Sequence, residues 1–280
     1  MEVPLRTAAG WPAPVERASA QEERIISEVG TKEVINGRNP VREVLRAGRR
    51  KVYRIVIARG SAEQGALADI LKEARRKDLS VERVSKGELG MLAAESHGVV
   101  AVVDPYPYAE LGDVLELAKR RGEAPLVLVL DALQDPQNLG TLIRTAEATG
   151  AHGVIVPYRG GVGVTPAVVA ASAGACEHML IVGANLAQAI ARLKEADVWI
   201  VGLDLGGPGA PLDAAQLKGP VALVVGSEGR GMRRLVRQSC DYSITLPMRG
   251  QVESMNAAVA GSIVLYAAFQ ARQPQAKREP

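Results

Sequence analysis

The chain has 280 residues, enough for two domains or one large domain at roughly 100–200 residues per domain. With 47% hydrophobic and 23% charged residues, its composition excludes wholesale disorder. Its net charge of +3 is only mildly basic, so a nucleic-acid partner would have to meet a local patch of the surface.

The first part of the chain predicts a tail and a small α/β domain. Residues 1–30 are rich in proline and charge without periodicity, which indicates a mobile tail. Over residues 31–107, apolar periodicity and turn residues predict a mostly parallel sheet with packed helices. We expect helices at 39–48, 61–74 and 86–94 and strands at 52–58, 81–84 and 99–103.

The second part predicts a larger α/β domain over residues 124–273, joined by a linker or connecting helix at 108–123 and followed by a tail at 274–280. Strands are expected at 126–130, 153–156, 180–182, 198–203, 221–225 and 242–246. Helices are expected at 138–149, 165–173, 186–196, 232–238 and 255–271, and a Gly/Pro-rich loop at 206–211. The last helix is apolar nearly all round, so a dimer partner is a candidate for covering its outer face.

Residue usage excludes several classes of protein. Cys176 and Cys240 are the only cysteines, which argues against a disulfide scaffold and fits a reducing compartment. The histidines and cysteines lack metal-ligand spacing, so we predict no metal site. There is no apolar run of about 18 residues and no basic segment followed by an apolar stretch at the start. We therefore expect no membrane span, no secretory signal and a cytoplasmic location.

Three polar clusters each follow an apolar strand, where the sites of open α/β sheets form. They occupy residues 131–144, 226–231 and 244–256. Taken singly, each has a structural explanation: Asn138, Ser254 or Asn256 could cap a helix, Arg144 could be a solvated surface residue, and the glycines could form a tight turn. Their joint occurrence in one α/β domain favours a composite site.

The clusters resemble the SpoU (TrmH) family of RNA 2′-O-ribose methyltransferases, within the SPOUT superfamily. The matching stretches are Asp135-Pro-Gln-Asn138-Leu-Gly-Thr-Leu-Ile-Arg144-Thr-Ala, Gly226-Ser-Glu228-Gly-Arg-Gly231, and Leu246-Pro-Met with Ser254-Met-Asn256-Ala-Ala-Val-Ala. Residues 36–45 and 96–101 resemble the L30e-like RNA-binding domain that accompanies 23S rRNA guanosine 2′-O-methyltransferases. The resemblance covers nearly everything after the N-terminal tail. Met255 stands where the family usually has Leu, which is a volume-conserving exchange.

The resemblance implies a homodimer with a trefoil knot near the C-terminus and S-adenosylmethionine (SAM) bound in the knot. It implies cofactor contacts at Leu203, Gly226, Gly231, Leu246 and Met255. An apolar slot with main-chain partners suits an adenine.

For catalysis, the candidates are Arg144 and Glu228, with Asn138, Ser254 and Asn256 positioning the ribose and the cofactor loop. Arginine is essentially always protonated, so Arg144 is better suited to bind the target phosphate and stabilise the developing oxyanion. The resemblance nevertheless points to this arginine as a base. Glu228 either orients Arg144 or takes the proton, and the sequence leaves both alternatives open.

Basic residues indicate where RNA would bind. Between Arg38 and Arg59, eight Arg and Lys residues are accompanied by one acid, Glu43, which favours a phosphate-contacting patch and binding that falls steeply with salt. The predicted RNA contacts are Arg38, Arg42, Arg46 and Arg49, with Arg230 and Arg233 beside the Gly-rich loop.

The favoured function is therefore methylation of a ribose 2′-hydroxyl of a 23S rRNA guanosine. A tRNA guanosine or an rRNA adenosine are alternative targets, because nothing in the sequence names the nucleotide. A non-catalytic RNA-binding dimer is the alternative outside the enzymes. A nicotinamide-dependent dehydrogenase is disfavoured, because the Gly-rich segment lacks the dinucleotide-binding spacing.

Overall fold

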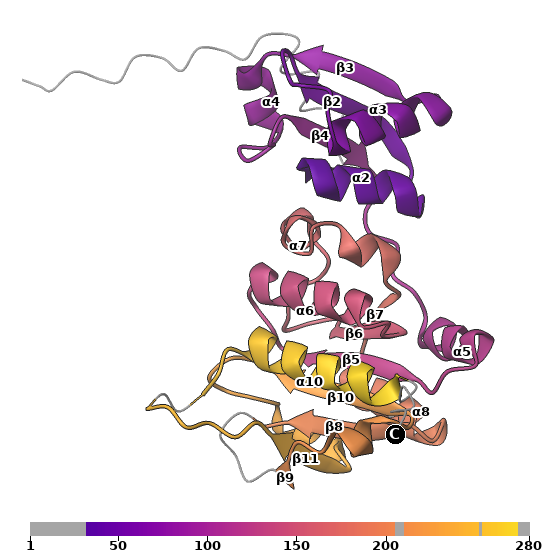
Figure 1. Ribbon diagram of the computed structural model, residues 1–280, viewed down its shortest axis with the longest axis vertical. Coiled ribbons are helices and arrows are strands. Elements are labelled where there is room, and N and C mark those ends of the chain that lie inside the picture. The colour runs from indigo at the N-terminus through magenta and orange to yellow at the C-terminus, as the bar shows by residue number, and fades with distance from the viewer. Residues whose placement is uncertain (1–31, 205–209, 252–253, 274–280) are drawn as a thin grey trace, which may run out of the picture.

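The computed structural model describes residues 32–204, 210–251 and 254–273, which form two stacked α/β domains (Figure 1). The predicted tails at 1–30 and 274–280, and most of the predicted loop at 206–211, lie outside the described residues. None of the described helices combines the length and the apolar composition needed to cross a bilayer.

The N-terminal domain has a four-stranded sheet in the order β1-β4-β2-β3. Its elements are β1 (Glu33–Asn36), α2 (Arg38–Ala47), β2 (Val52–Ala58), α3 (Ala66–Arg76), β3 (Ser80–Val84), α4 (Lys86–Leu92) and β4 (Val99–Val103). The prediction of a mostly parallel sheet is wrong, because β4 runs antiparallel to both of its neighbours and only β2 and β3 are parallel. The short α4 does not carry the chain back across the sheet, so β4 starts at the edge where β3 ends.

Two local features of this domain also differ from expectation. Helix α3 begins at Ala66 with Gly65 at its N-cap, so the predicted start at Ser61 is wrong. The edge strand β1 is only four residues long, too short to give a periodic signal in the sequence. By contrast, α2 ends at Gly48 in the left-handed conformation, as the glycine predicts.

The larger domain is built on a seven-stranded sheet in the order β7-β6-β5-β10-β8-β11-β9, and every pairing in it is parallel. The strands are β5 (Leu126–Asp131), β6 (Gly153–Pro157), β7 (Ile181–Ala184), β8 (Trp199–Leu203), β9 (Ala210–Pro211), β10 (Val221–Gly226) and β11 (Tyr242–Thr245). The α-helices are α5 (Leu111–Arg121), α6 (Pro136–Ala148), α7 (Pro166–Ala171), α8 (Leu186–Glu195), α9 (Arg234–Ser239) and α10 (Ala257–Arg272). Two 3₁₀ helices, η1 (Ala175–His178) and η2 (Ala214–Leu217), complete the domain.

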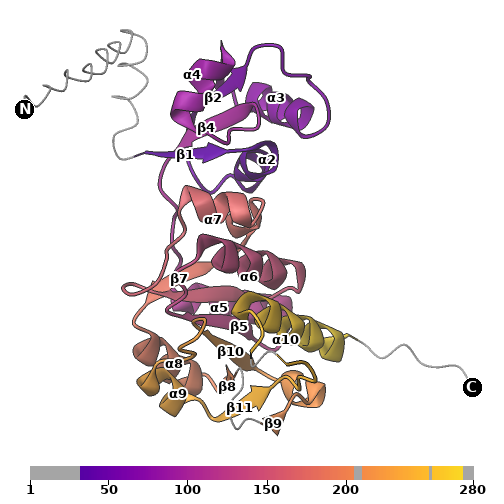
Figure 2. The ribbon, with the colours of Figure 1, turned by 90° about the vertical axis from the view of Figure 1, so that its left-hand side faces the viewer.

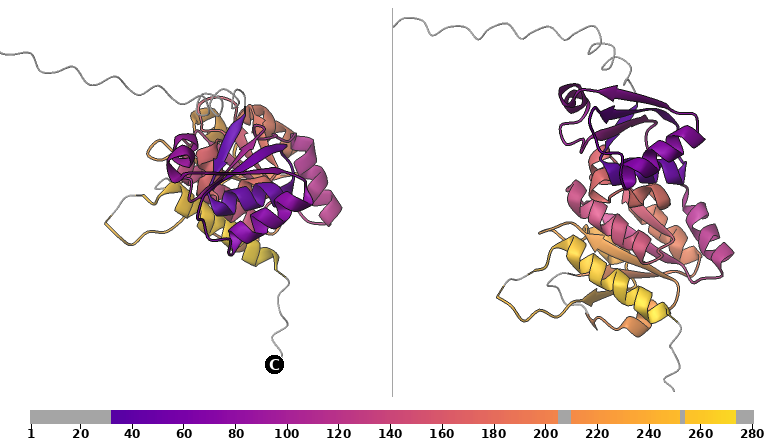
Figure 3. Two further views of the ribbon diagram at one scale, coloured as in Figure 1. Left: turned by 90° about the horizontal axis from the view of Figure 1, so that it is seen from above. Right: turned by 45° about the horizontal axis from the view of Figure 1, so that its top comes forward.

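Helices cover both faces of this sheet, which explains why its central strands are apolar on both sides. Helices α6, α7 and α10 pack on one face, and α10 lies along α6 (Figures 1 and 3). Helices α5, α8 and α9 pack on the other face, with α8 beside α9 (Figure 2). Residues 108–123 contain α5, whose Leu111 and Val114 belong to this second core. The trefoil knot implied by the family resemblance stays a prediction.

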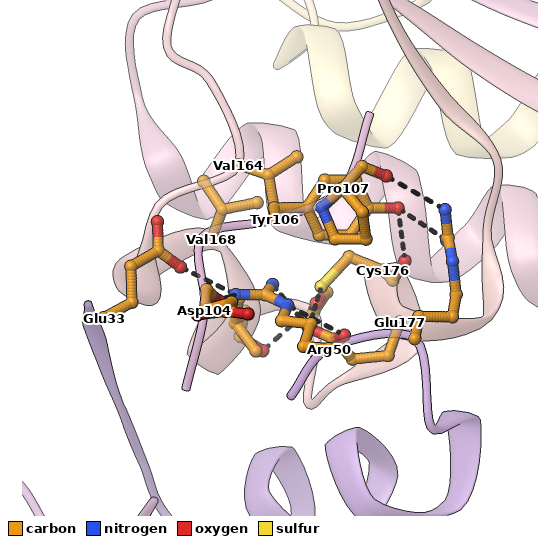
Figure 4. A network of polar contacts seen from close by, with 12 residues as sticks. Glu33, Arg50, Asp104, Tyr106, Pro107, Val164, Val168, Cys176 and Glu177 are labelled. Atoms are coloured by element: carbon orange, nitrogen blue, oxygen red, sulfur yellow. Dashed lines mark hydrogen bonds and ion pairs between the residues drawn. The ribbon is translucent and has the colours of Figure 1, made fainter. Parts of the chain in front are cut away.

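The two domains meet through a buried ion pair (Figure 4). Arg50, between α2 and β2, donates to both carboxylate oxygens of Glu177 in η1, at 2.6 and 3.1 Å. Both side chains are 0% exposed, and Arg50 also donates to Glu33 at 2.7 Å. Burial raises the pKa of the Glu177 carboxyl, and the facing guanidinium of Arg50 opposes that rise. Such a pair holds the junction together only while both partners are present.

Arg49 and Tyr106 surround this ion pair. The Tyr106 hydroxyl lies 2.7 Å from the carbonyl oxygen of Met179 in the larger domain. Arg49 donates to the Tyr106 hydroxyl at 2.9 Å, to the Pro107 carbonyl at 3.1 Å and to the Met179 carbonyl. Arg49, which the sequence analysis predicts to contact RNA, therefore has its guanidinium engaged at the domain junction, and its RNA contact stays a prediction.

Gly174 shows how closely the domains approach. It precedes η1 with a φ of +87°, which favours glycine. A Cβ atom on Gly174 would also lie 2.7 Å from the Cβ of Glu43 on α2. Both the backbone conformation and the close approach therefore require glycine here.

We predict that removing one partner of the buried pair, as in Glu177→Ala, lowers the free energy of unfolding by about 3–5 kcal/mol, because it leaves Arg50 charged and buried beside fewer carboxylates. The double variant Arg50→Met/Glu177→Leu should recover most of this loss. Urea denaturation measures both effects.

The matched control is Glu63→Ala, which breaks the ion pair of Arg83 and Glu63, with side chains 43% and 46% exposed. It should cost less than about 1 kcal/mol. Equal losses in the buried and exposed pairs would contradict the structural role of the junction.

Candidate functional site

The candidate site lies at the carboxyl edge of the seven-stranded sheet. Parallel pairing of β5 with β10 sets Asp131 beside Gly226. On the other side of β10, Val225 pairs with Leu203 of β8, and Leu203 pairs with Ile244 of β11. The loops that follow these four strands therefore start at one edge, where the sites of open α/β sheets form.

Three polar side chains that follow β5, β10 and β11 in the chain form one hydrogen-bonded group, which we call the amide–carboxylate cluster. Asn138 and Asn256 both donate through Nδ2 to Oε1 of Glu228, and the bond from Asn256 is 2.7 Å long. The Nδ2 atom of Asn256 also lies 3.2 Å from Oδ1 of Asn138. Each of the three polar clusters in the sequence thus contributes one side chain to a single group.

The first turn of α6 positions Asn138. Asp135 is the N-cap of this helix, because its side chain accepts a 2.9 Å bond from the N–H of Gln137, and Pro136 occupies the first helical position. Asn138 is buried inside the turn, so it does not have the capping role considered from the sequence. A buried amide is costly without partners, and Asn138 finds them in Glu228 and Asn256.

The loop from Gly226 to Gly231 positions Glu228 by folding back on itself. Ser227 and Gly231 exchange two main-chain hydrogen bonds, of 3.1 and 2.8 Å. A Cβ atom on Gly226 would lie 2.2 Å from the carbonyl carbon of Gly231. Gly226 is therefore required by the close approach of the loop. The tight turn considered for these glycines is present, and α9 begins only after Arg233.

Asn256 has two structural roles. Its Oδ1 atom accepts bonds from the N–H groups of Ala258 and Val259, at 2.9 and 3.1 Å, so it caps α10. Its Nδ2 atom meanwhile donates to Glu228. Ser254 is exposed and makes no hydrogen bond to another described residue, so the structure does not bring it into the cluster.

Arg144 lies on the same helix as Asn138 but is separate from the cluster. Six positions along an α-helix correspond to about 9 Å along the axis and roughly 240° around it. The Arg144 side chain is exposed and forms no hydrogen bond or ion pair within the described part of the chain. Beside it, Thr145 Oγ1 lies 2.9 Å from Ser262 Oγ, which ties this stretch of α6 to α10.

Asp131 is a site residue whose role the sequence reasoning missed. Its side chain is 0% exposed and accepts two 2.6 Å bonds from Arg233, one from the main-chain N–H and one from Nε. The available signal is an acidic residue that ends an otherwise apolar strand. Arg233, predicted to contact RNA, is therefore held in place while half of its side chain stays exposed. Arg230 is exposed in the loop before it.

The basic patch on α2 carries less free charge than the sequence suggests. Arg42 donates to Glu43 at 2.8 Å, and Arg46 pairs with Asp69 of α3 at 3.2 Å. Arg38 is half-exposed at the start of α2. Since their charges are partly balanced, the prediction that these residues contact RNA gains nothing from this geometry.

Metal ligation is not supported in the described ranges, which hold no group of three or more His, Cys, Asp or Glu side chains placed around one point. Cys176 is buried, and His178 Nε2 lies 3.0 Å from Glu43 Oε2. Both therefore belong to the junction between the domains.

Comparison with known families identifies both domains. The profile of the SpoU rRNA Methylase family matches residues 125–266. A second profile, described as RNA 2′-O ribose methyltransferase substrate binding, matches residues 34–109.

Relatives and solved structures agree with these profiles. The protein YacO of Bacillus subtilis (strain 168), named as a TrmH family tRNA/rRNA methyltransferase, is 40% identical over 242 residues, covering 85% of this chain and 95% of YacO. A TrmH family tRNA/rRNA methyltransferase of Staphylococcus aureus (strain MSSA476) is 41% identical over 243 residues, covering 85% and 96%. The crystal structure of the SpoU methyltransferase AviRb from Streptomyces viridochromogenes with AdoMet superposes with a TM-score of 0.72 at 25% identity, covering 91% of this chain and 99% of AviRb.

The residues at the sheet edge fit the cofactor of this family, SAM (AdoMet). Leu246 and Met255 are half-buried and pack against the core, so part of each apolar side chain stays exposed, as an adenine slot requires, while their contact with the cofactor stays a prediction. Leu203 and Gly226 end neighbouring strands at the same edge, and Gly231 adds a main-chain segment without a side chain. This chain belongs to the SpoU (TrmH) family of RNA methyltransferases, which use SAM as the methyl donor.

Proposed function

We propose that this protein methylates a ribose 2′-hydroxyl of a guanosine in 23S rRNA. The observation that carries the proposal is the amide–carboxylate cluster of Asn138, Glu228 and Asn256 at the carboxyl edge of the sheet. The match of residues 34–109 to the substrate-binding profile supports ribose as the acceptor and RNA as the substrate.

The sulfonium of bound SAM supplies an activated methyl group, so the protein has to orient the acceptor and remove its proton. Glu228 is suited to remove the proton. Both amide donors bind its Oε1 atom, which leaves Oε2 without a hydrogen bond to any described residue. The two amides thus fix the carboxylate while one oxygen stays available to the 2′-hydroxyl.

Arg144 is assigned to charge stabilisation. Its guanidinium is permanently charged and has no partner among the described residues, so it can bind the target phosphate or the developing 2′-oxyanion. Because it lies away from the cluster in its own chain, we propose that it acts at the boundary with a second copy.

That second copy would bind along α10 to form a homodimer. Val259, Ile263 and Tyr266 are 49%, 41% and 54% exposed and share one side of this helix through i, i+4 and i+7 spacing. Apolar side chains exposed in a row indicate a protein interface. The contact of Thr145 with Ser262 sets this stripe close to the part of α6 that carries Arg144.

The identity of the RNA is tested in cells. We expect that ribose methylation mapped over 23S rRNA loses one guanosine signal in a strain that lacks the gene, and that the intact gene restores it. If the methylation signal is lost at a tRNA guanosine or an rRNA adenosine instead, that nucleotide is the target and the proposed one is wrong. No lost signal in any RNA would favour the non-catalytic RNA-binding dimer. We also propose a cytoplasmic location, where the RNA substrate would be accessible.

We predict that Arg144→Ala lowers kcat for RNA methylation by at least about 100-fold, because it removes a charge that acts on the transition state. The Kd for SAM, measured by titration calorimetry, should stay within about twofold of the wild type. Arg120→Ala, which removes an exposed arginine from the last turn of α5, is the control and should keep full activity. Near-normal turnover of Arg144→Ala would refute its role.

A pair of Asn256 variants separates helix capping from the cluster. Asn256→Ser keeps a good N-cap but loses the donor to Glu228, so we expect stability within about 0.5 kcal/mol of the wild type and a fall in kcat of about 10-fold or more. Asn256→Ala should in addition lose about 1 kcal/mol of unfolding free energy. Wild-type kcat in Asn256→Ser would show that the cluster is not needed for the reaction.

For the dimer, we expect light scattering to give a mass of twice the 29.6 kDa chain. Ile263→Arg buries a charge in the proposed interface and should yield monomers. Met91→Arg adds the same charge at an exposed position of α4 and should leave the dimer intact. A monomeric wild type, or a dimeric Ile263→Arg protein, would rule out this interface.

A further inference from the structure

A cavity of about 560 Å³ opens at the carboxyl edge of the large sheet. It lies on the side covered by α8 and α9, two helices that Figure 2 labels side by side. It is lined by the end of β6 and the residues after it, by the start of α8 and by the start of α9. Pro157 of β6 is paired with Ala184 of β7, so two of these walls are neighbouring strand ends. The predicted cofactor contacts do not line this cavity.

The polar lining of the cavity is basic. Arg159, Arg233 and Arg234 line it, and no acidic side chain from the described ranges does. Arg159 and Arg234 are exposed and form no ion pair with a described residue. Asp131 holds Arg233 through Nε and leaves the two terminal amino groups without a described partner. Guanidinium groups presented in this way suit phosphate oxygens.

Two exposed apolar side chains stand among these arginines. Tyr158 is 77% exposed, the highest value among the large hydrophobic residues of the described part of the chain. Its N–H donates to the Ala184 carbonyl at 3.1 Å, and its ring lies against Gly183, where a Cβ atom would come within 3.0 Å of Cε1. Leu235 is 64% exposed and lines the same cavity. An anchored aromatic ring beside guanidinium groups is the composition that stacks nucleobases.

The cavity shares two loops with the amide–carboxylate cluster. The loop after β5 leads to Asn138 and also carries Gln134, which donates to the carbonyl of Gly160 at 2.8 Å, two residues after the tyrosine of the cavity. The loop after β10 carries Glu228 in the cluster and ends at Arg233 in the cavity. An RNA strand with one ribose at Glu228 therefore has its neighbouring nucleotides within reach of the cavity.

We propose that this cavity binds a nucleotide next to the methylated one, with its base stacked on Tyr158 and its phosphate held by Arg159 and Arg234. The position of that nucleotide rests on the proposed function. Stacking accepts any base, so the cavity anchors the strand and leaves the choice of the target to other contacts.

Binding and activity are measured separately. We expect Tyr158→Ala to weaken binding of a labelled, mixed-sequence RNA of about 12 nucleotides about 10-fold in fluorescence anisotropy, and Tyr158→Phe to stay within about twofold. Arg159→Ala and Arg234→Ala should each reduce the slope of log K against log salt by about 0.7. In methylation of a 23S rRNA transcript, Tyr158→Ala should raise KM for RNA and leave the Kd for SAM unchanged.

Two controls match these substitutions. Trp199→Ala removes an aromatic ring that is 58% exposed at the start of β8, the opposite edge of the sheet. Arg120→Ala removes a distant exposed charge. Both should bind the RNA as the wild type does.

If the Tyr158, Arg159 and Arg234 variants all bind the RNA like the wild type, the inference is overturned whatever the activity. A 10-fold rise in the Kd for SAM in Tyr158→Ala would assign the cavity to the methyl donor and overturn it as well. If the wild type methylates no RNA but the variants weaken RNA binding, the proposed function fails while the cavity is confirmed as an RNA site.

Discussion

The parallel pairing of β5 with β10 is the constraint on which the candidate site in the larger domain depends. These strands end with Asp131 beside Gly226, and both following loops must leave the sheet at that point. The loop after β10 folds back so tightly that any side chain at Gly226 would collide with Gly231. Because the two loops are forced together there, Asn138 meets Glu228 on one side and Asp131 holds Arg233 on the other. The cluster and the basic cavity are two consequences of one strand register.

Charged side chains also hold the two domains together. Arg50 is removed from water and bonded to Glu177 and Glu33, while Arg49 donates across the same junction to the carbonyl of Met179. These contacts set the orientation of the N-terminal domain relative to the seven-stranded sheet. Arginines that serve the junction are not available to phosphate groups. The N-terminal domain therefore has fewer unpaired arginines than its count of basic residues suggests.

Much of the fold could be predicted because it is encoded locally. The apolar runs at β2, β4 and β5, and the glycine that ends α2, are signals contained within a few residues. The direction of β4 could not be predicted this way, since it depends on how far α4 carries the chain. The edge strand β1 forms because it pairs with β4, and no local sequence pattern indicates this pairing.

For the site, the sequence by itself determined the family, and through it the residues that form the cluster, because the three polar segments are specific in combination. It also determined that the last helix is apolar nearly all round and that metal-ligand spacing is absent, whereas the structure showed which of its apolar residues stay exposed. Only the tertiary structure decided that Asn138 is a buried partner of Glu228, that Asp131 orients Arg233, and that Arg49 serves the domain junction. The physical reason is that periodicity and spacing report the preference of a residue for water or for a turn. The hydrogen-bond partner of a buried polar group depends on which distant segments of the chain the fold brings next to it.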